Sequence, residues 1–522
     1  MRQIDKDTLL QMLLERDLEQ GIATLRDLPK PDSLTHALTG AQKVVECMNK
    51  GQEILVVGDY DADGICASAL MCRFFERLGY EKFRLVIPHR FIDGYGVSAA
   101  LLEKYANNAS IVVSVDNGIN AFCAGDWCKE HNIVFIITDH HTPANTLPQA
   151  DVIIDPYMAD CSFIQKSICG AVVAWYFCAA IKQILGASID MGEFLEYLAL
   201  ASIADIMPLV GINRILVKKG IERLRNSSSP LALLIRSKLK TINAENLAFS
   251  IVPLLNCAGR MANANLALDF LLAPSVVDAL RIYDKLFELN VQRKSVQSEI
   301  LSLAQMPNIE SEHIIVSYGE DWHEGVLGIV ASSLAQEKGK SAFVLSYSNG
   351  ILKGSGRSFG GLNLIASITP LSKHLLRFGG HSGAVGISLE LEQLEGFINA
   401  LESALIFDDI KENAILGVIE SASINEELLA ICERFEPFGE GNPKPIFLCE
   451  NLQIQSLKPL GRDKKHLSYI LNDKSNGVLL EAIEFFVPQM REIGQSGNVQ
   501  FELMRDDYNN KVKMKILQFD VS

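Results

Sequence analysis

Between residues 50 and 160, short apolar runs alternate with amphipathic stretches. Each of the apolar runs is short, continuous and β-rich, so we expect strands at 53–58, 83–88, 110–115, 133–138 and 151–154. The stretches 65–79, 97–106 and 121–131 carry apolar residues at helical spacing, and Gly79 is a stop signal for the first of these helices. Strict alternation of strand and helix predicts a parallel sheet covered by helices on both faces.

The rest of the chain divides into helical and β-rich regions. Apolar periodicity predicts helices at 193–204, 214–225 and 278–303. A second α/β region begins near Glu312, includes the glycine-rich sequence GGHSGAVGISL and ends with a helix at 392–405. From Phe435 onwards, short alternating strands predict a small antiparallel β-barrel.

The composition is that of an ordinary globular protein. The 522 residues suggest about three to four domains, and 48% apolar with 21% charged residues excludes wholesale disorder. The longest strongly apolar stretch, Gly170–Ile181, is too short to cross a bilayer, and we see no secretory signal. The eleven cysteines form no CxxC pair, so we expect reduced, buried thiols in a cytoplasmic protein that does not contact membranes.

The net charge of −15 argues against a nucleic-acid-binding protein, because such proteins usually carry a basic surface. The charge is unevenly distributed, however. Between Asp205 and Lys240, eight basic and two acidic residues give a local charge of +6. This segment fits a solvated helix face and a nucleic-acid-binding surface equally well.

Acidic and imidazole side chains follow three of the predicted strands. The first strand is followed by Asp59, Asp61 and Asp63, the third by Asp116, and the fourth by Asp139, His140 and His141. Sites in open α/β sheets form at the carboxyl ends of the strands, so these groups should converge. A further carboxylate, Asp205, ends an apolar helix and has no evident partner in the sequence.

Each of these groups alone also has a structural explanation. The DxDxDG sequence can form a turn or a calcium-binding loop, Asp-His-His can cap a helix, and Asp205 can be a cap. We interpret Asp155, which precedes a proline, as part of a turn. Taken together, the groups indicate a site for two divalent cations, which would relieve the repulsion between the carboxylates.

The residue types also restrict the metal and the chemistry. Carboxylates with imidazoles and no thiolate suit Mn²⁺ or Mg²⁺, and the imidazoles favour Mn²⁺. Two such ions can clamp the attacking and leaving oxygens of a phosphoryl displacement. Because the sequence has no P-loop and no Ser-His-Asp pattern, it predicts metal-assisted phosphoester hydrolysis.

Four motifs carry a family resemblance: GDYDADG (58–64), VSVDNGI (113–119), TDHHTP (138–143) and IADIMPL (203–209). They resemble the motifs of the DHH phosphoesterase superfamily, and more specifically of its RecJ branch of single-strand-specific 5′→3′ DNA exonucleases. Further RecJ-like sequences follow in the right order: LLNCAGRM (254–261), DWHEGVLGIVAS (321–332), GSGRS (354–358), GGHSGAVGIS (379–388) and FEPFGEGNP (435–443).

The resemblance implies an α/β fold with several domains. These are an N-terminal helical segment (1–49), a parallel-sheet DHH catalytic domain (50–210), a helical linker (211–308), a second α/β, DHH-associated (DHHA1) domain (309–408) and a C-terminal OB-like barrel (409–522). The barrel would hold single strands by basic grooves and aromatic stacking.

The resemblance also implies roles for individual residues. Two ions of Mn²⁺ or Mg²⁺ would be held by Asp61, Asp63, Asp116, His140, His141 and Asp205, with Asp116 bridging them. Asp59 and Asp139 would complete the catalytic set by orienting the ligands. The implied substrate-binding residues are Arg90, Tyr95, Asn256, Arg260, His323, Ser355, Arg357, Ser358, Gly380 and His381. Among them, Arg357 and His381 would bind phosphate near the scissile bond, and Arg90 and Tyr95 would lie where the 5′ end lodges.

Two positions depart from the family pattern. Ser333 stands where arginine is usual, which puts one phosphate contact in doubt, and Cys257 replaces an expected alanine, a mild change. The implied protein is a monomer that degrades single-stranded DNA from the 5′ end to mononucleotides in repair and recombination. A single-strand-binding protein and a helicase are the implied partners.

Two other functions stay open. One is a DHH-family phosphodiesterase acting on oligonucleotides or cyclic dinucleotides, which the additional region 435–522 disfavours. The other is a non-catalytic replication scaffold, which the complete set of metal-ligand candidates disfavours.

Overall fold

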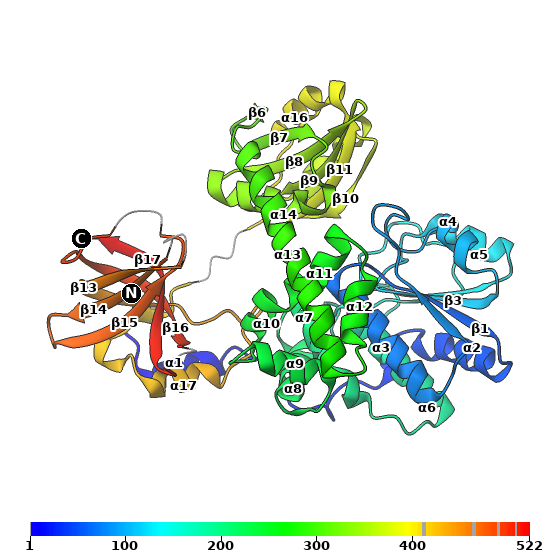
Figure 1. Cartoon of the computed structure of the whole chain (residues 1–522), viewed down its shortest axis with the longest axis horizontal. Helices are drawn as coiled ribbons and strands as arrows, with labels where there is room; N and C mark the ends of the chain where they lie inside the picture. Colours follow the sequence, from blue (N-terminus) through cyan, green and yellow to red (C-terminus); the bar gives the residue numbers. More distant parts are fainter. Residues whose placement is uncertain (1, 410–413, 462–465, 488–490, 507–508, 522) are drawn as a thin grey trace. The chain divides into compact units, whose positions relative to one another are not determined.

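The computed structural model describes residues 2–409, 414–461, 466–487, 491–506 and 509–521 (Figure 1). The chain forms two compact units. The first consists of Met1–Pro253, Leu268–Leu280 and Asn413–Ser522, and the second of Leu254–Ala267 and Arg281–Glu412. The boundaries of the five domains expected from the sequence stay predictions.

A five-stranded parallel sheet organises the N-terminal half of the first unit. Its strands are β1 (Glu53–Val57), β2 (Phe83–Val86), β3 (Ala109–Val115), β4 (Val134–Thr138) and β5 (Val152–Ile154), in the order β2-β1-β3-β4-β5. Every neighbouring pair is parallel, as the alternating pattern predicted. From β1 the sheet grows to one side with β2 and to the other side with β3, β4 and β5. Ligand sites form at such a switch in strand order, here between β1 and β3.

Helices cover both faces of this sheet. On one face, α4 (Ala99–Tyr105) and α5 (Phe122–Glu130) bury Leu101 and Cys128 against Leu55, Val112 and Phe135. On the other lie α2 (Ala37–Asn49), α3 (Ala62–Leu78) and α6 (Gly170–Leu185), which contact one another or the strands. The strands are therefore buried on both sides, which explains why they are continuously apolar.

A group of helices follows. They are α7 (Leu195–Ala204), α8 (Gly211–Asn226), α9 (Pro230–Lys238), α10 (Ala244–Ser250), α11 (Val252–Met261), α12 (Asn265–Leu271) and α13 (Val276–Ala304). The predicted helices at 193–204, 214–225 and 278–303 correspond to α7, α8 and α13. Among the described residues, no helix combines the length and the apolar character needed to cross a membrane.

The second unit contains a six-stranded mixed sheet. Its strands are β6 (Ile309–Glu310), β7 (Ile314–Glu320), β8 (Ser341–Ser348), β9 (Ile351–Arg357), β10 (Arg377–His381) and β11 (Ala384–Glu390), in the order β10-β11-β9-β8-β7-β6. Its helices are α14 (Glu324–Lys338), α15 (Leu364–Ile368) and α16 (Leu394–Glu402). Helix α14 connects β7 to β8, which is the parallel pair of this sheet.

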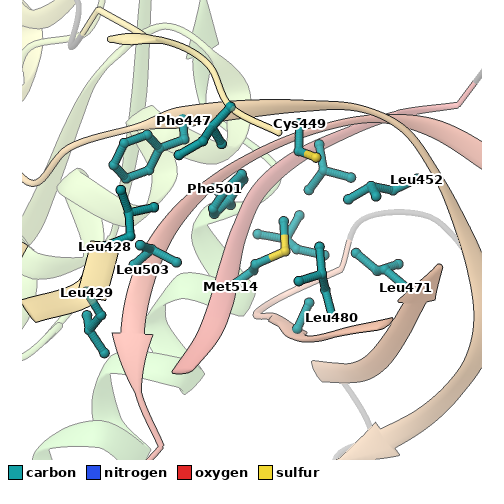
Figure 2. Packing of buried hydrophobic residues seen from close by; sticks show 14 of the residues in the cluster. Leu428, Leu429, Phe447, Cys449, Leu452, Leu471, Leu480, Phe501, Leu503 and Met514 are labelled. Atoms are coloured by element: carbon teal, nitrogen blue, oxygen red, sulfur yellow. The ribbon is translucent and has the colours of Figure 1, made fainter. Parts of the chain in front are cut away.

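The C-terminal strands close into a barrel around an apolar core (Figure 2). They are β12 (Gly417–Val418), β13 (Phe447–Leu460), β14 (His466–Asp473), β15 (Val478–Glu484), β16 (Ser496–Arg505) and β17 (Val512–Val521), with α17 (Glu426–Glu433) beside them. The predicted small barrel is confirmed, but not all of its pairs are antiparallel, because β15 and β17 pair in parallel. Five strands, β13-β14-β15-β17-β16, close the ring through the β13–β16 pair. An odd number of strands cannot alternate in direction all the way round, so one neighbouring pair must be parallel.

The N-terminal segment divides between two parts of the first unit. Helix α1 (Lys6–Leu14) joins the barrel, where Leu9 and Leu13 share a core with Leu428 and Phe447. Helix α2, in contrast, packs under the parallel sheet, since a Cβ at Gly40 would touch Ile154.

Candidate active site

The segment from Gly58 to Gly64, which comprises the loop after β1 and the first turn of α3, carries three carboxylates. Asp61 caps α3 by accepting a hydrogen bond from the N–H of Gly64 (3.0 Å), and Asp59 accepts one from the N–H of Tyr60 (2.7 Å). A Cβ at Gly64 would lie 2.5 Å from the Cβ of Asp59. Glycine is therefore required here for the helix to begin so close to the end of the strand.

The N-terminus of α6 holds the third carboxylate of this loop. Asp63 accepts hydrogen bonds from the N–H groups of Gly170 (2.7 Å) and Ala171 (2.9 Å). A Cβ at Gly170 would lie 2.3 Å from Oδ1 of Asp116. Gly170 thus lets a helix terminus, which carries partial positive charge, approach two buried carboxylates. The sequence analysis missed this residue, because nothing local links it to motifs more than 50 positions away.

Asp116 follows β3 in a left-handed backbone conformation (φ 63°) and is almost completely buried. Its Oδ1 lies 3.2 Å from Nε2 of His140 but makes no hydrogen bond with any described residue. Burial, followed by the charges of Asp63 and Asp61, raises the pKa of Asp116 well above its ordinary value. A buried, unsatisfied acceptor of this kind needs a cation or a proton.

Asn117 is a second residue that the sequence analysis did not assign. Its side chain accepts a hydrogen bond from the N–H of Val97 (2.9 Å) and donates to the carbonyls of Val57 (3.2 Å) and Val115 (2.9 Å). It therefore fastens the ends of β1 and β3 to the loop before α4. The motif VSVDNGI predicts a role for its aspartate but not for the amide that follows it.

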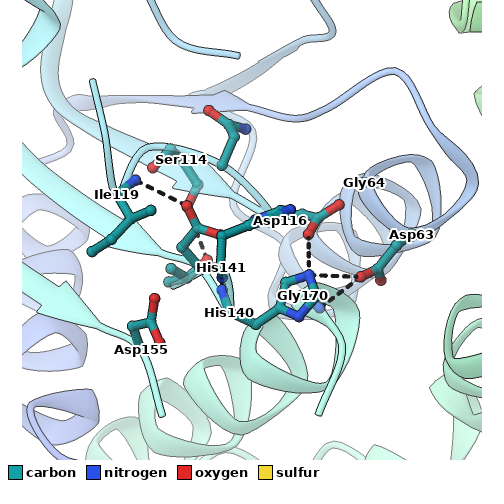
Figure 3. Close-up of polar contacts among 12 residues, drawn as sticks. Asp63, Gly64, Ser114, Asp116, Ile119, His140, His141, Asp155 and Gly170 are labelled. Atoms are coloured by element: carbon teal, nitrogen blue, oxygen red, sulfur yellow. Dashed lines mark hydrogen bonds and ion pairs between the residues drawn. The ribbon is translucent and has the colours of Figure 1, made fainter. Parts of the chain in front are cut away.

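The Asp-His-His motif follows β4, and its two rings face different partners. Nε2 of His140 lies 3.7 Å from Asp63, 3.2 Å from Asp116 and 3.6 Å from Asp205. Figure 3 shows the His140 ring directed towards Asp116 and Asp63. His141 turns its Nδ1 towards Oδ1 of Asp139 instead (2.7 Å), which leaves its Nε2 available.

Asp139 is held by several donors. Besides His141, the N–H groups of Ile119 (2.9 Å) and His140 (2.8 Å) donate to it. Burial alone would raise the pKa of Asp139, but the hydrogen bond and the charge of His141 outweigh burial and lower it. Opposing effects also act on His141: burial lowers its pKa, but Asp139 and further carboxylates outweigh burial and raise the pKa to about 9.

Asp205 is the residue that ends α7. Burial and the charges of Asp63 and Asp61 raise its pKa to about 8, and its Oδ2 has no hydrogen-bond partner among the described residues.

Asp155 lies at the same sheet edge. It accepts a hydrogen bond from the N–H of Tyr157 (2.7 Å), as a turn residue does, but its buried Oδ2 has no hydrogen-bond partner in the described part of the chain.

These side chains fit divalent cations. Within the described part of the chain, three groups place ligand atoms within 4.8 Å of one another: Asp116, His140 and His141; Asp63, His140 and Asp205; and Asp59, Asp61 and Asp116. Among the described residues, no hydrogen-bond donor satisfies Oδ1 of Asp116 or Oδ2 of Asp205, so these oxygens are open to a cation. The third group gives Asp59 a ligand position, whereas the sequence analysis expected it only to orient ligands.

Arg90 and Tyr95 lie in the loop before α4, around Tyr60 of the first motif. The Arg90 guanidinium carbon is 5.3 Å from the centre of the Tyr60 ring, and the Tyr95 ring meets the Tyr60 ring edge-on at 5.9 Å. Tyr60 directly follows Asp59. The structure therefore places these two predicted residues beside the carboxylate loop.

The remaining predicted substrate residues belong to the second unit. Ser355 and Arg357 are two positions apart on β9, and Arg357 pairs with Ala384, which pairs with His381 on β10. Residues opposite one another share a face of a sheet, so Ser355, Arg357 and His381 lie on the same face. A Cβ at Gly328 of α14 would lie 2.7 Å from Nη2 of Arg357, so this glycine leaves room for the guanidinium.

The other predicted residues of this unit lie on neighbouring elements. Asn256 and Arg260 are four positions apart on α11, hence on one helix face. The backbone carbonyl of Arg260 is beside Gly325, whose N–H donates to His323 at the start of α14. The N–H of Ser358 donates to the carbonyl of Gly383 (3.0 Å), and Gly380 pairs with Val385 between β10 and β11. That these residues and the metal-ligand candidates bind the same strand of DNA stays a prediction.

Comparisons with known proteins agree with one another over most of the chain. The DHH family, N-terminal domain matches residues 53–203, the DHHA1 domain residues 311–406 and the RecJ OB domain residues 417–519. The single-stranded-DNA-specific exonuclease RecJ of Haemophilus influenzae is 33% identical over 88% of this chain and 86% of its own length. The crystal structure of RecJ from Thermus thermophilus in complex with Mn²⁺ matches 97% of this chain and 74% of that one, with 26% identity and a TM-score of 0.81. A Mg²⁺ complex of RecJ from the same organism matches 99% and 78%, with 24% identity and a TM-score of 0.76.

Proposed function

This chain belongs to the RecJ family of the DHH phosphoesterases, and from that premise we propose that it is a metal-dependent exonuclease of single-stranded DNA. One observation carries the proposal. Side chains from four separate segments meet at the carboxyl edge of the parallel sheet, and buried oxygens of two of them, Asp116 and Asp205, have no hydrogen-bond partner among the residues that the structure describes. Such a cluster is stable as a binding site for cations and costly without them.

We propose that two ions, Mn²⁺ or Mg²⁺, are held by Asp61, Asp63, Asp116, His140, His141 and Asp205, and the third ligand group adds Asp59 to this set. When bound, such a pair of ions activates water and neutralises the charge of an in-line phosphoryl displacement. Asp139 fixes the His141 ring so that Nε2 faces the ligands, a common arrangement at metal sites.

Other residues of the chain bind and orient the DNA in this proposal. Arg357 and His381 bind the backbone phosphate near the scissile bond, with Ser355 hydrogen-bonded to Arg357 (2.6 Å). Asn256, Arg260, His323, Ser358 and Gly380 extend this phosphate-binding surface. Arg90 and Tyr95 receive the 5′ end, which gives degradation a 5′→3′ direction, and the OB-type barrel holds the strand.

The test uses 20-mers labelled at the 5′ or the 3′ end, incubated with purified full-length protein and Mn²⁺. We expect the 5′ label to be released first and as a mononucleotide. Release of the 3′ label first would contradict the direction. Hydrolysis of dinucleotides but not of 20-mers would favour the oligonucleotide phosphodiesterase, and failure to bind Mn²⁺ at any concentration would favour the scaffold.

We further propose that the protein acts as a cytoplasmic monomer in DNA repair and recombination, with a single-strand-binding protein and a helicase as partners. Membership of the RecJ family supports this part of the proposal. Sedimentation of the purified chain tests the monomer: a dimer at micromolar concentration would contradict it.

A further inference from the structure

The loop 435–443, with the sequence FEPFGEGNP, contacts the segment that directly follows Asp205. The carbonyl of Glu440 accepts a hydrogen bond from the backbone N–H of Leu209 (2.7 Å). A Cβ at Gly439 would lie 2.8 Å from Cδ1 of Leu209, and one at Gly441 would lie 3.2 Å from Cβ of Pro208. The loop is therefore packed against residues three and four positions beyond the carboxylate.

This loop is itself firmly held. Arg214 of α8 donates to the three consecutive carbonyls of residues 435–437, at 3.0–3.3 Å. Asn442 is completely buried, and its amide donates to two of the same carbonyls (2.9 Å each). Arg16 in turn donates to Oδ1 of Asn442 (2.8 Å). Such a network of satisfied hydrogen bonds makes the loop rigid enough to position what packs on it.

The turn after Asp205 is strained and needs support on both sides. Ile206 adopts a left-handed conformation (φ 53°), although it is β-branched and 70% exposed. This conformation costs a non-glycine residue about 1–2 kcal/mol. On the helix side, the N–H of Met207 bonds to the carbonyl of Ser202 (3.0 Å). On the other side, Pro208 and Leu209 rest on the loop 435–443.

We propose that the loop 435–443 is a positioning element for Asp205, through which the C-terminal part of the chain sets the affinity of the metal centre. This inference rests on the ligand role of Asp205 proposed above. A strained residue keeps its conformation only where the surrounding structure over-determines it. Asn213 also donates to the carbonyl of Pro208 (3.0 Å), and Gly211 to that of Leu18 (2.8 Å). Loosening the loop alone therefore weakens the placement of Asp205 without abolishing it.

The test is calorimetric titration of the metal-free, full-length protein with Mn²⁺, alongside kinetics on a 20-mer. We expect wild type to bind two ions and Asp205→Asn to lose one of them. Gly441→Ala adds a Cβ against Pro208 at a positive φ (72°), and it should weaken one Mn²⁺ site about tenfold, as loss of a ligand's support does. Its kcat should fall at limiting Mn²⁺ and recover at high Mn²⁺, while KM for DNA is unchanged. Glu440→Ala is the matched control, because it removes an exposed side chain and keeps the carbonyl that bonds to Leu209.

The outcomes separate this inference from the proposed function. If Asp205→Asn binds both ions, the ligand role of Asp205 is wrong. If Asp205→Asn loses a site but folded Gly441→Ala binds Mn²⁺ as Glu440→Ala does, the positioning role is wrong. Should Gly441→Ala not fold, Gly439→Ala and Arg214→Lys replace it, since the first meets only the movable end of Leu209. Both must then weaken one Mn²⁺ site, and normal binding in either overturns the proposal.

Discussion

At the scale of single residues, two backbone conformations beside the carboxylates cost free energy. Asp116 (φ 63°) and Ile206 (φ 53°) both lie in the left-handed region that favours glycine. Asp116 lies against the N-terminus of α6, and Ile206 lies between α7 and the segment at 208–209. Neighbouring contacts therefore hold these residues in conformations that they would not adopt in isolation.

Replacing Ile206 by glycine should stabilise the protein. Glycine populates this conformation without the steric cost of a β-branched side chain, so we expect the free energy of unfolding to rise by about 1 kcal/mol. Thermal melts of the full-length chain measure the change. Ile206→Val keeps the branching at Cβ and should show no gain. A lower melting temperature for Ile206→Gly would contradict the strain.

Asp116→Asn should separate stability from activity. Removing this charge relieves repulsion from Asp63 and Asp61, so the metal-free variant should melt at a higher temperature than metal-free wild type. With Mn²⁺, its nuclease activity should fall about a hundredfold or more, because a proposed bridging ligand is lost. Wild-type activity in this variant would exclude the bridging role.

The affinity for Mn²⁺ should rise with pH. In the metal-free protein the pKa of Asp205 is raised to about 8 and that of His141 to about 9, so both carry protons at neutral pH. An incoming cation must displace these protons, and binding therefore strengthens as the pH increases from 6 to 9. Titrations in buffers of different ionisation enthalpy count the protons released. Asp139→Asn removes the group that raises the pKa of His141 and should flatten the pH dependence.

The residues that follow strands were predictable, whereas those that support them were not. Asp61, Asp116 and His140 could be placed together because parallel strands end at one edge. Gly170 and Asn117 act through contacts with segments that are distant in the sequence. Neither residue type nor periodicity shows such contacts.

At the scale of elements, the barrel encloses a charged cluster that its strands must satisfy. Glu484 on β15 is 96% buried, accepts a hydrogen bond from the Tyr469 hydroxyl and lies 3.2 Å from Nη2 of Arg491. Arg491 also stacks over the ring of Phe519, with its guanidinium carbon 5.3 Å from the ring centre. Burial of such charges is costly unless each is paired with an opposite charge.

Glu484→Gln should therefore destabilise the barrel. It leaves the Arg491 guanidinium buried without its carboxylate, and breaking a buried pair in this way costs about 3–5 kcal/mol. Urea unfolding followed by hydrogen exchange in the barrel strands measures the loss. Glu481→Gln is the control, because Glu481 is more exposed and lies 3.5 Å or more from Lys511 and Lys513. Equal stability of the two variants would contradict the importance of the buried cluster.

Hydrophobic periodicity predicted most elements, but not all of their pairings. Apolar runs located β1 to β5 and the strands of the barrel, because the strands bury alternate or successive side chains. The parallel β15–β17 pair follows from ring closure, and the docking of α1 on the barrel follows from long-range packing of Leu9 and Leu13. Neither the parallel pair nor the docking of α1 can be predicted from the local sequence.

At the scale of the whole molecule, ion pairs join the helical region of the first unit to the barrel. Glu245 of α10 pairs with Lys444 and with Lys515 of β17 (3.1 Å). Burial raises the pKa of Glu245, but the two lysines outweigh burial and lower it. A carboxyl whose pKa is lower in the folded state stabilises the fold above its unfolded pKa of about 4.3 and loses this contribution as the pH falls.

Acid should therefore loosen this junction. We expect wild type to lose more stability than Glu245→Gln as the pH falls from about 5 to about 3, because only wild type has this carboxylate to protonate. Hydrogen exchange in α10 and β17 reports the junction directly. Parallel loss of stability in the two proteins would exclude Glu245 as the cause.

The packing of α1 on the barrel has a consequence for biosynthesis. Leu9 and Leu13 are translated more than 400 residues before Leu428 and Phe447, the side chains that cover them. At about 5–20 residues per second, a ribosome needs roughly 20–80 s to complete that distance. Throughout this interval the apolar face of α1 is uncovered on the nascent chain, where a chaperone can bind it. The barrel core is completed only when the C-terminal strands are synthesised and pack against this helix.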